Sequence, residues 1–75
     1  MATVCAAVYY TSNAGYDVTT KIQGYLNQSE TFTVNNTSMG GDPDPGVAKN
    51  FAMIYTNGTH YYAVQCQENT VVYAG

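Results

Sequence analysis

The sequence predicts a mainly β domain, with about five strands in a largely antiparallel sheet and one short helix between the first two strands. Three observations favour this fold. Runs of β-branched and aromatic residues recur along the chain, one segment changes to a helical period, and Asn57-Gly58 separates two strand-like runs. The length of 75 residues fits one domain, residues 1–75, which buries only about 60% of the surface that the unfolded chain exposes.

The first strand is predicted at "TVCAAVYY", residues 3–10, because Val and Tyr favour strands and the turn-like "TSNAG" follows. The segment "DVTTKIQGYLNQ", residues 17–28, then changes period. Its apolar residues at i, i+4, i+7 and i+8 form one face of a helix, which consists of Val18, Ile22, Tyr25 and Leu26. Asp17 or Thr19 is placed to cap this helix by accepting a backbone N–H hydrogen bond.

The other strands are predicted at "ETFTV" (30–34), on both sides of Asn57-Gly58, and at "TVVYAG" (70–75), with a long loop over 35–48. Asn-Gly tolerates the two positive φ angles of a type I′ hairpin turn, and this turn sets a register. The expected facing pairs are Thr56–Thr59, Tyr55–His60, Ile54–Tyr61 and Met53–Tyr62.

Both faces of this hairpin carry apolar side chains. Alternation places Phe51 and Met53 on one face, and Ile54 and Ala63 on the other. The short helix covers only one face, so we expect a second copy of the chain or a bound partner to cover the other. The predicted assembly is a homo-oligomer that pairs face to face like a sandwich, since small chains often gain stability by oligomerisation.

The charge of the chain excludes several partners. Charged residues make up 9% of the sequence, with a net charge of -3. The only cations, Lys21 and Lys49, cannot form the basic surface that binds nucleic acid or an anionic membrane. No apolar run approaches the roughly 20 residues of a membrane-spanning helix. The N-terminus lacks the pattern of a secretory signal, which leaves a cytoplasmic location and secretion without a recognisable signal both open.

The stretch "GGDPDPGVAKNF", residues 40–51, has three readings. A phosphate-binding loop is rejected because Lys49 is followed by an apolar strand and two aspartates would repel phosphate. A calcium site would use Asp42 and Asp44, but no third acid lies nearby to complete the oxygen ligands. The favoured reading is a rigid corner in which the prolines fix the backbone and both aspartates point outward. We therefore expect no metal and no cofactor.

Residues suited to catalysis are few. His60 is the only histidine, the residue type most used as a general base, and it lies beside the hairpin turn. Cys5 and Cys66 occupy predicted strand positions, so neither is expected to act as a nucleophile with His60. No enzymatic activity is predicted. The two cysteines could form a disulfide, and buried free thiols are the alternative.

Tyrosines interleaved with neutral polar residues suit a carbohydrate or a protein surface as partner. Aromatic faces cover the C–H surface of a sugar, while amides and carboxylates bond its hydroxyls. The candidate ligand-binding residues are Asn36, Asp42, Asp44, Tyr55, His60 and Tyr61. The predicted function is a non-catalytic, lectin-like binding module. The alternatives are a structural or self-assembly module that makes only protein contacts, and a small secreted inhibitor or toxin-like protein with a disulfide.

The segments "DVTTKIQGYL", "FTVNN", "GGDPDPGVAKNFAMIYT" and "VQCQENTVV" occur in this order. Their order resembles a small β-rich domain known as the C-terminal domain of a DnaJ-like mitochondrial protein and as stand-alone modules in fungi and bacteria. The match covers Asp17 to Val72 and is most specific in Gly41–Gly46 with Lys49. The resemblance implies a compact β domain used for association or recognition, with no ligand and no catalytic residues to carry over. The sequence contains no J-domain, so a chaperone role is not expected.

Overall fold

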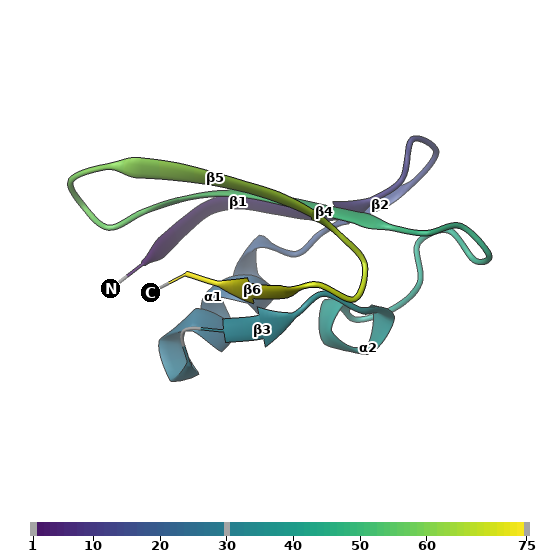
Figure 1. The fold of residues 1–75 in the computed structure, drawn as a ribbon, viewed down its shortest axis with the longest axis horizontal. Coiled ribbons are helices and arrows are strands. Elements are labelled where there is room, and N and C mark those ends of the chain that lie inside the picture. Colours follow the sequence, from purple (N-terminus) through teal and green to yellow (C-terminus); the bar gives the residue numbers. More distant parts are fainter. Residues whose placement is uncertain (1, 30, 75) are drawn as a thin grey trace.

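The computed structural model of the chain describes residues 2–29 and 31–74, which form two layers (Figure 1). The first layer is an antiparallel sheet with the strand order β2-β1-β4-β5. Its strands are β1 (Thr3–Tyr10), β2 (Gly15–Asp17), β4 (Asn50–Thr56) and β5 (Tyr61–Gln67). The first predicted strand is confirmed with both of its ends, whereas β2 was not predicted.

The second layer lies beneath this sheet in Figure 1 and contains both helices and two short strands. Strands β3 and β6 pair antiparallel with each other. The elements of this layer are α1 (Thr19–Gln28), β3 (Thr31–Thr33), α2 (Asn36–Met39) and β6 (Val71–Tyr73). The protein is therefore a small mixed α/β domain in which strands predominate.

The predicted single sheet of about five strands is wrong, because β3 and β6 form a sheet of their own. Each has only three residues, and each turns an apolar side chain toward the core: Phe32 and Val72 are both buried. The inner face of the main sheet is thus covered by a helix and a second small sheet, where a helix alone was expected. Glu30 and Gly75, which were expected to lie in these strands, are outside the described residues.

Helix α1 forms where its period predicts it. Ile22 is fully buried, and Tyr25 and Leu26 pack at the edge of the core. The N-cap residue of α1 is Val18, whose side chain makes no capping hydrogen bond, so neither predicted capping residue occupies that position. Asp17, one residue earlier, accepts hydrogen bonds from the backbone N–H of Thr19 at 2.9 Å and from its hydroxyl at 2.6 Å. These bonds satisfy a donor that the first turn of a helix otherwise leaves free.

The start of α1 also covers one edge of β1. The Val4 N–H donates to Gln23 Oε1 at 2.7 Å, and the Ala7 N–H donates to Thr19 Oγ1 at 2.9 Å. The Ala7 carbonyl in turn accepts from the Val18 N–H at 2.9 Å. Beyond the short β2, the backbone groups of Val4 and Ala7 in β1 are therefore bound by side chains of α1 and by the turn into the helix.

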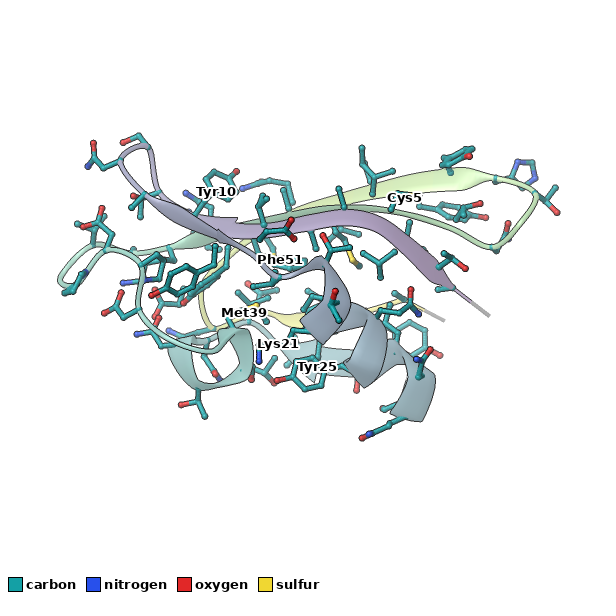
Figure 2. All side chains as sticks on the ribbon, turned by 180° about the vertical axis from the view of Figure 1, so that it is seen from behind. Cys5, Tyr10, Lys21, Tyr25, Met39 and Phe51 are labelled. Carbon is teal, nitrogen blue, oxygen red and sulfur yellow. The ribbon has the colours of Figure 1, made fainter. Side chains whose placement is uncertain are left out.

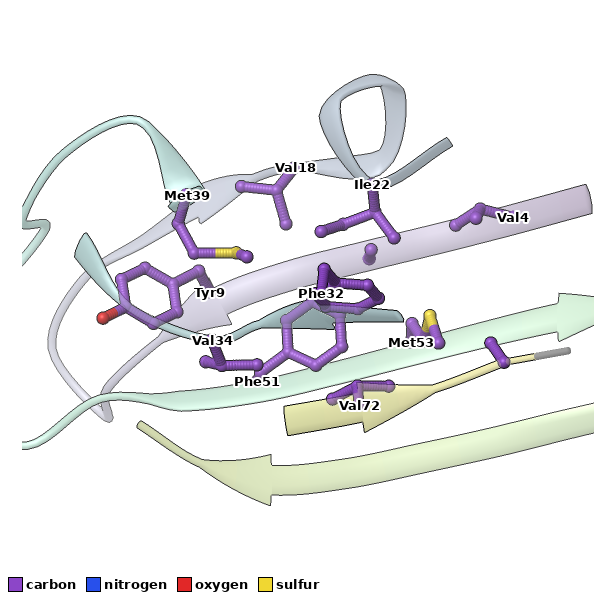
Figure 3. Packing of buried hydrophobic residues seen from close by; sticks show 12 residues of the cluster. Val4, Tyr9, Val18, Ile22, Phe32, Val34, Met39, Phe51, Met53 and Val72 are labelled. Carbon is purple, nitrogen blue, oxygen red and sulfur yellow. The ribbon is translucent and has the colours of Figure 1, made fainter. Parts of the chain in front are cut away.

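The core lies between the two layers and combines aromatic with aliphatic side chains (Figure 3). Phe51 of β4 and Met39 of α2 both belong to this core and come from opposite layers (Figure 2). The Phe51 ring packs edge-on against Phe32 with centroids 5.4 Å apart, a geometry that aromatic pairs prefer. The largest fully buried side chains are Tyr9, Phe51, Ile22, Met39 and Val34.

The hairpin between β4 and β5 is confirmed, but its predicted register is wrong. The observed facing pairs are Thr56–Tyr61, Tyr55–Tyr62, Ile54–Ala63 and Met53–Val64. The loop has four residues, because Asn57 Oδ1 accepts from the backbone N–H groups of Thr59 and His60, both at 2.9 Å. This side-chain turn replaces the expected two-residue backbone turn. The shift of two positions leaves every strand side chain on its predicted face.

The predicted loop over residues 35–48 contains one structured turn, the helix α2. The Asn35 side chain accepts from the Ser38 N–H at 2.8 Å, which caps the start of α2. Gly40 ends it with a φ of 92°, a left-handed conformation that favours glycine. A helix of four residues is too short to show a sequence period, which explains why it was not predicted.

Candidate interaction surface

Lys49 organises the glycine- and proline-rich corner. Its side chain is only 3% exposed, and its Nζ lies 2.6 Å from Asp42 Oδ1. The same ammonium donates to the carbonyl oxygens of Asp44 at 2.9 Å and Val47 at 2.6 Å. A buried ammonium needs such partners because burial removes its hydration. The corner therefore folds around this lysine.

The two aspartates of the corner bind groups of the protein itself. Asp44 Oδ2 accepts a hydrogen bond from the Thr11 hydroxyl at 2.7 Å, and Asp42 is paired with Lys49. The hydrogen bond from Lys49 lowers the pKa of the Asp42 carboxyl below its ordinary value of 3.8. A turn closed by the Val47 N–H on the Asp44 carbonyl, with Gly46 at a φ of 82°, completes the corner. The expected rigid corner is present, but the prediction that both carboxylates point outward is wrong.

Asn36 is also engaged within the fold. Its Oδ1 accepts a 2.6 Å hydrogen bond from the hydroxyl of Tyr9, a side chain with no exposed surface. Burial, together with the negative charges of Glu68 and Asp42, raises the pKa of Tyr9 to about 12. Glu68 itself accepts from the Lys49 N–H at 2.9 Å. The polar groups at this end of the molecule bond to one another, and these bonds stabilise the fold.

The hairpin end carries the other predicted site residues. Tyr55 stacks on Tyr62 with ring centroids 5.2 Å apart, and His60 meets Tyr62 edge-on at 6.5 Å. Asn57 Nδ2 donates to the Tyr62 hydroxyl at 3.3 Å. Tyr61 points to the opposite face of the strand and is 75% exposed. Tyr62 was not among the predicted site residues, although the alternation of the strand places it beside Tyr55.

The two halves of the predicted site lie apart. Lys49 and its aspartates precede β4, whereas the loop Asn57–His60 follows it, so the strand separates them by about 20 Å. Figure 1 shows the hairpin loop and α2 toward opposite ends of the molecule. The structure brings Tyr55 and His60 together around Tyr62, and it leaves Asn36, Asp42 and Asp44 at the far end. One sugar cannot contact both groups.

A different surface is open to a partner: the outer face of the main sheet, which points away from the second layer. This face contains a shallow hollow of about 340 Å³. Val8 and Ile54 project beside it, with 40% and 48% of their surface exposed. The hollow is lined by Ala6, Ala7, Val8, Ala52, Met53, Ile54, Ala63, Val64 and Gln65.

The hollow forms because small and large side chains alternate across the strands. Ile54 faces Ala6 on one side and Ala63 on the other, while Val8 faces Ala52. Alanines leave space between the branched side chains that flank them. The sequence contained a signal for this surface, since the apolar outer face of the hairpin was predicted, but the contribution of β1 depends on a strand pairing that no local pattern specifies.

Cys5 and Cys66 are free thiols in the structure. Cys5 is exposed on β1 (Figure 2), where the pairing with β4 shifts between Val4 and Ala6. Cys66 lies half-buried in β5, and burial raises the pKa of its thiol. Strand β4 separates β1 from β5, a gap of roughly 10 Å that exceeds the reach of a disulfide. The structure does not form the possible disulfide.

Within residues 2–29 and 31–74, no three His, Cys, Asp or Glu side chains gather closely enough to hold one metal ion. The helices described there are too short and too polar to cross a membrane. Comparison of the chain with protein-family models, curated proteins and solved structures finds no match. The resemblance to the DnaJ-associated domain therefore stays a prediction that rests on the corner motif and the order of the segments around it.

Proposed function

We propose that this protein is a non-catalytic interaction module that self-associates through the outer face of its main sheet. The observation that carries the proposal is the hollow between Val8 and Ile54, an apolar depression on the side of the sheet that the second layer leaves open. Contiguous apolar surface of this kind marks interaction sites on small proteins.

The charge distribution favours a second copy as the occupant. The chain has a net charge of -3, yet strands β1, β4 and β5 contain no charged residue. The acids Asp42, Asp44 and Glu68 gather with Lys49 at one end of the molecule instead. Two copies of a negatively charged protein would repel each other, and an uncharged face is where such copies meet at least electrostatic cost.

The shape of the face is also suited to pairing with itself. A two-fold axis places the same patch on both subunits, so each projecting group needs a recess on the partner. Ile54 is such a projection, and the alanines beside it provide the recess. Full burial of an isoleucine stabilises an interface by roughly 1.5–3 kcal/mol. Ile54 is therefore expected to contribute most to this contact.

Light scattering after gel filtration tests the proposal with two matched variants. Ile54→Lys places a charge in the middle of the outer face. Val71→Lys places the same charge on β6, where Val71 is 65% exposed in the second layer. We expect the wild-type mass to be a multiple of 8.1 kDa, Ile54→Lys to lower it, and Val71→Lys to leave it unchanged. Equal masses for wild type and Ile54→Lys, with both folded by circular dichroism, would exclude the outer face.

Carbohydrate binding remains a second candidate, and it rests on the exposed aromatic rings at the hairpin end. Tyr61 is 75% exposed, whereas Tyr62 lies on the opposite face of the strand with His60 beside it. Stacking by Tyr61 would cover the C–H surface of a sugar ring. Titration with neutral monosaccharides at millimolar concentration, followed by NMR, should shift the signals of Tyr61 and its neighbours in wild type and produce no shift in Tyr61→Ala. An unchanged spectrum at this end would eliminate a lectin-like role for these neutral sugars.

A further inference from the structure

Strand β5 forms an open edge of the main sheet. It ends the strand order, and none of its seven residues is buried, whereas its neighbour β4 buries Phe51 and Met53. The opposite edge is protected. There β2 has only three residues, and the backbone of β1 beyond it bonds to α1 and to the turn before it.

The backbone groups that point outward from β5 follow from its bonds to β4. One backbone hydrogen bond lies at each end of the β4–β5 pairing. The Asn57 N–H donates to the His60 carbonyl at 3.3 Å, and the Glu68 N–H donates to the Lys49 carbonyl at 2.9 Å. Hydrogen-bonded pairs alternate along antiparallel strands, so the even-numbered residues of β5 bond to β4. The odd-numbered residues, from Tyr61 to Gln67, therefore direct their backbone groups toward the open edge.

This edge lacks the features that normally prevent an exposed edge strand from pairing with a strand of another molecule. Exposed edges of monomeric proteins carry lysine, proline or a bulge, or are covered by another element. The sequence of β5, "YYAVQCQ", contains no charged residue and no proline, and its register with β4 has no bulge. Tyr62, although it faces the second layer, is still 40% exposed, so that layer does not fully cover the inner side of this edge.

We propose that β5 pairs antiparallel with β5 of a second copy, about a two-fold axis at Val64. The two main sheets then become one sheet of eight strands. This interface is additional to the outer face, and it uses backbone groups where the outer face uses side chains.

The register follows from the alternation. Odd-numbered residues carry the free backbone groups, so they must face odd-numbered residues of the second copy. An axis at Val64 meets this condition for all seven residues: Tyr61 faces Gln67 of the second copy, and Ala63 faces Gln65 of the second copy. No like charges meet along the strand. The side chains of Tyr61, Ala63 and Gln65 keep to the outer face, so that face continues across the boundary.

Disulfide trapping tests this register. Val64 would face Val64 of the second copy as a non-hydrogen-bonded pair, with Cα atoms about 4.5 Å apart, which a disulfide can bridge. The variant Val64→Cys is made with Cys5→Ser and Cys66→Ser, and oxidised by glutathione disulfide, which takes up the two electrons and two protons of the thiols. The control is Val71→Cys in the same background, an exposed position on the other sheet.

We expect Val64→Cys to give a covalent dimer within minutes at micromolar protein and Val71→Cys to give at least tenfold less. Absence of the Val64→Cys dimer, while the wild type still has a mass above 8.1 kDa, would overturn the edge pairing and leave the outer face as the interface. A wild type that is monomeric at every concentration would overturn both.

A second measurement separates the two interfaces by mass. Gln67→Pro removes an outward N–H without removing a bond to β4, and Gln67 is not among the residues that line the outer hollow. Proline blocks pairing at an edge. With both interfaces present, we expect the wild type to exceed a dimer. Ile54→Lys and Gln67→Pro should each give a dimer, and the double variant a monomer. A Gln67→Pro variant that folds by circular dichroism and keeps the wild-type mass would contradict the edge pairing.

Discussion

The Lys49 ammonium lies 2.6 Å from the Asp42 carboxylate, although the lysine side chain is only 3% exposed. The pair links the end of the corner to its beginning, and the same ammonium bonds two carbonyl oxygens in between. One of the two lysines of the chain is thus used to hold the loop that precedes the central strand β4. The corner therefore has a structural role. It fixes the start of β4, the strand that contributes Phe51 to the core and Ile54 to the outer face.

Replacement of Lys49 by methionine should destabilise the fold by about 2–4 kcal/mol, because the carbonyls of Asp44 and Val47 lose their donor. Lys21→Met is the matched control, since Lys21 is exposed and its replacement should change stability by less than about 0.5 kcal/mol. Urea unfolding followed by circular dichroism measures both. Similar midpoints for the two variants would contradict the role of Lys49.

Acid should weaken the corner through Asp42. The hydrogen bond from Lys49 lowers the pKa of this carboxyl from 3.8 in the folded state, so the unfolded chain binds the proton more readily. The stabilisation is complete above about pH 5 and is lost as pH falls through the lowered pKa. Asp42→Asn should therefore be less stable than wild type at neutral pH and lose less stability on acidification. Unfolding curves between about pH 7 and pH 2 that run parallel for the two proteins would refute this.

Alkali should act through Tyr9. Its pKa is raised to about 12 by burial and by neighbouring carboxylates, against 10.0 ordinarily. A raised folded pKa gives stability that is present below pH 10 and lost as pH rises toward 12. Tyr9→Phe should reduce this loss and cost about 1 kcal/mol at neutral pH, because the bond to Asn36 is missing. Tyr61→Phe, at an exposed position, is the control, and an alkaline loss of equal size in Tyr9→Phe would contradict the assignment.

The two thiols should react at different rates. Cys5 is exposed, whereas Cys66 is half-buried and burial raises the pKa of its thiol. Since the thiolate is the reactive form, iodoacetamide should modify Cys5 first in the Ile54→Lys variant, where the outer face is uncovered. Peptide mass mapping over time measures the order. Isolation of a Cys5–Cys66 disulfide from this protein would contradict the structure and favour the toxin-like alternative.

Local patterns in the sequence predicted the elements that depend on local interactions. The β-branched and aromatic residues at 3–10 and the helical face around Ile22 are visible in short windows, and both elements formed there. The hairpin was predicted for the same reason, but its register was not. The side chain of Asn57 competes with the backbone for the turn bonds, and this choice between two turn types is not visible in the dipeptide.

Local patterns could not predict contacts between residues that lie far apart in the sequence. The strands around Phe32 and Val72 lie about forty residues apart and pair with each other, which no local period indicates. Asp42 and Asp44 were predicted as outward ligands because the positions of Lys49 and Thr11 relative to them depend on the folded corner. The outer face was foreseen in part, since the apolar character of both hairpin faces is a local property.

The mass of the unmodified protein tests the proposed self-association most directly. Sedimentation equilibrium over a wide range of protein concentrations gives this mass without labels or variants. We expect a species of at least twice 8.1 kDa that dissociates on dilution. A single species of 8.1 kDa at the highest concentration reached would show that the exposed Val8 and Ile54 have no second copy as their partner.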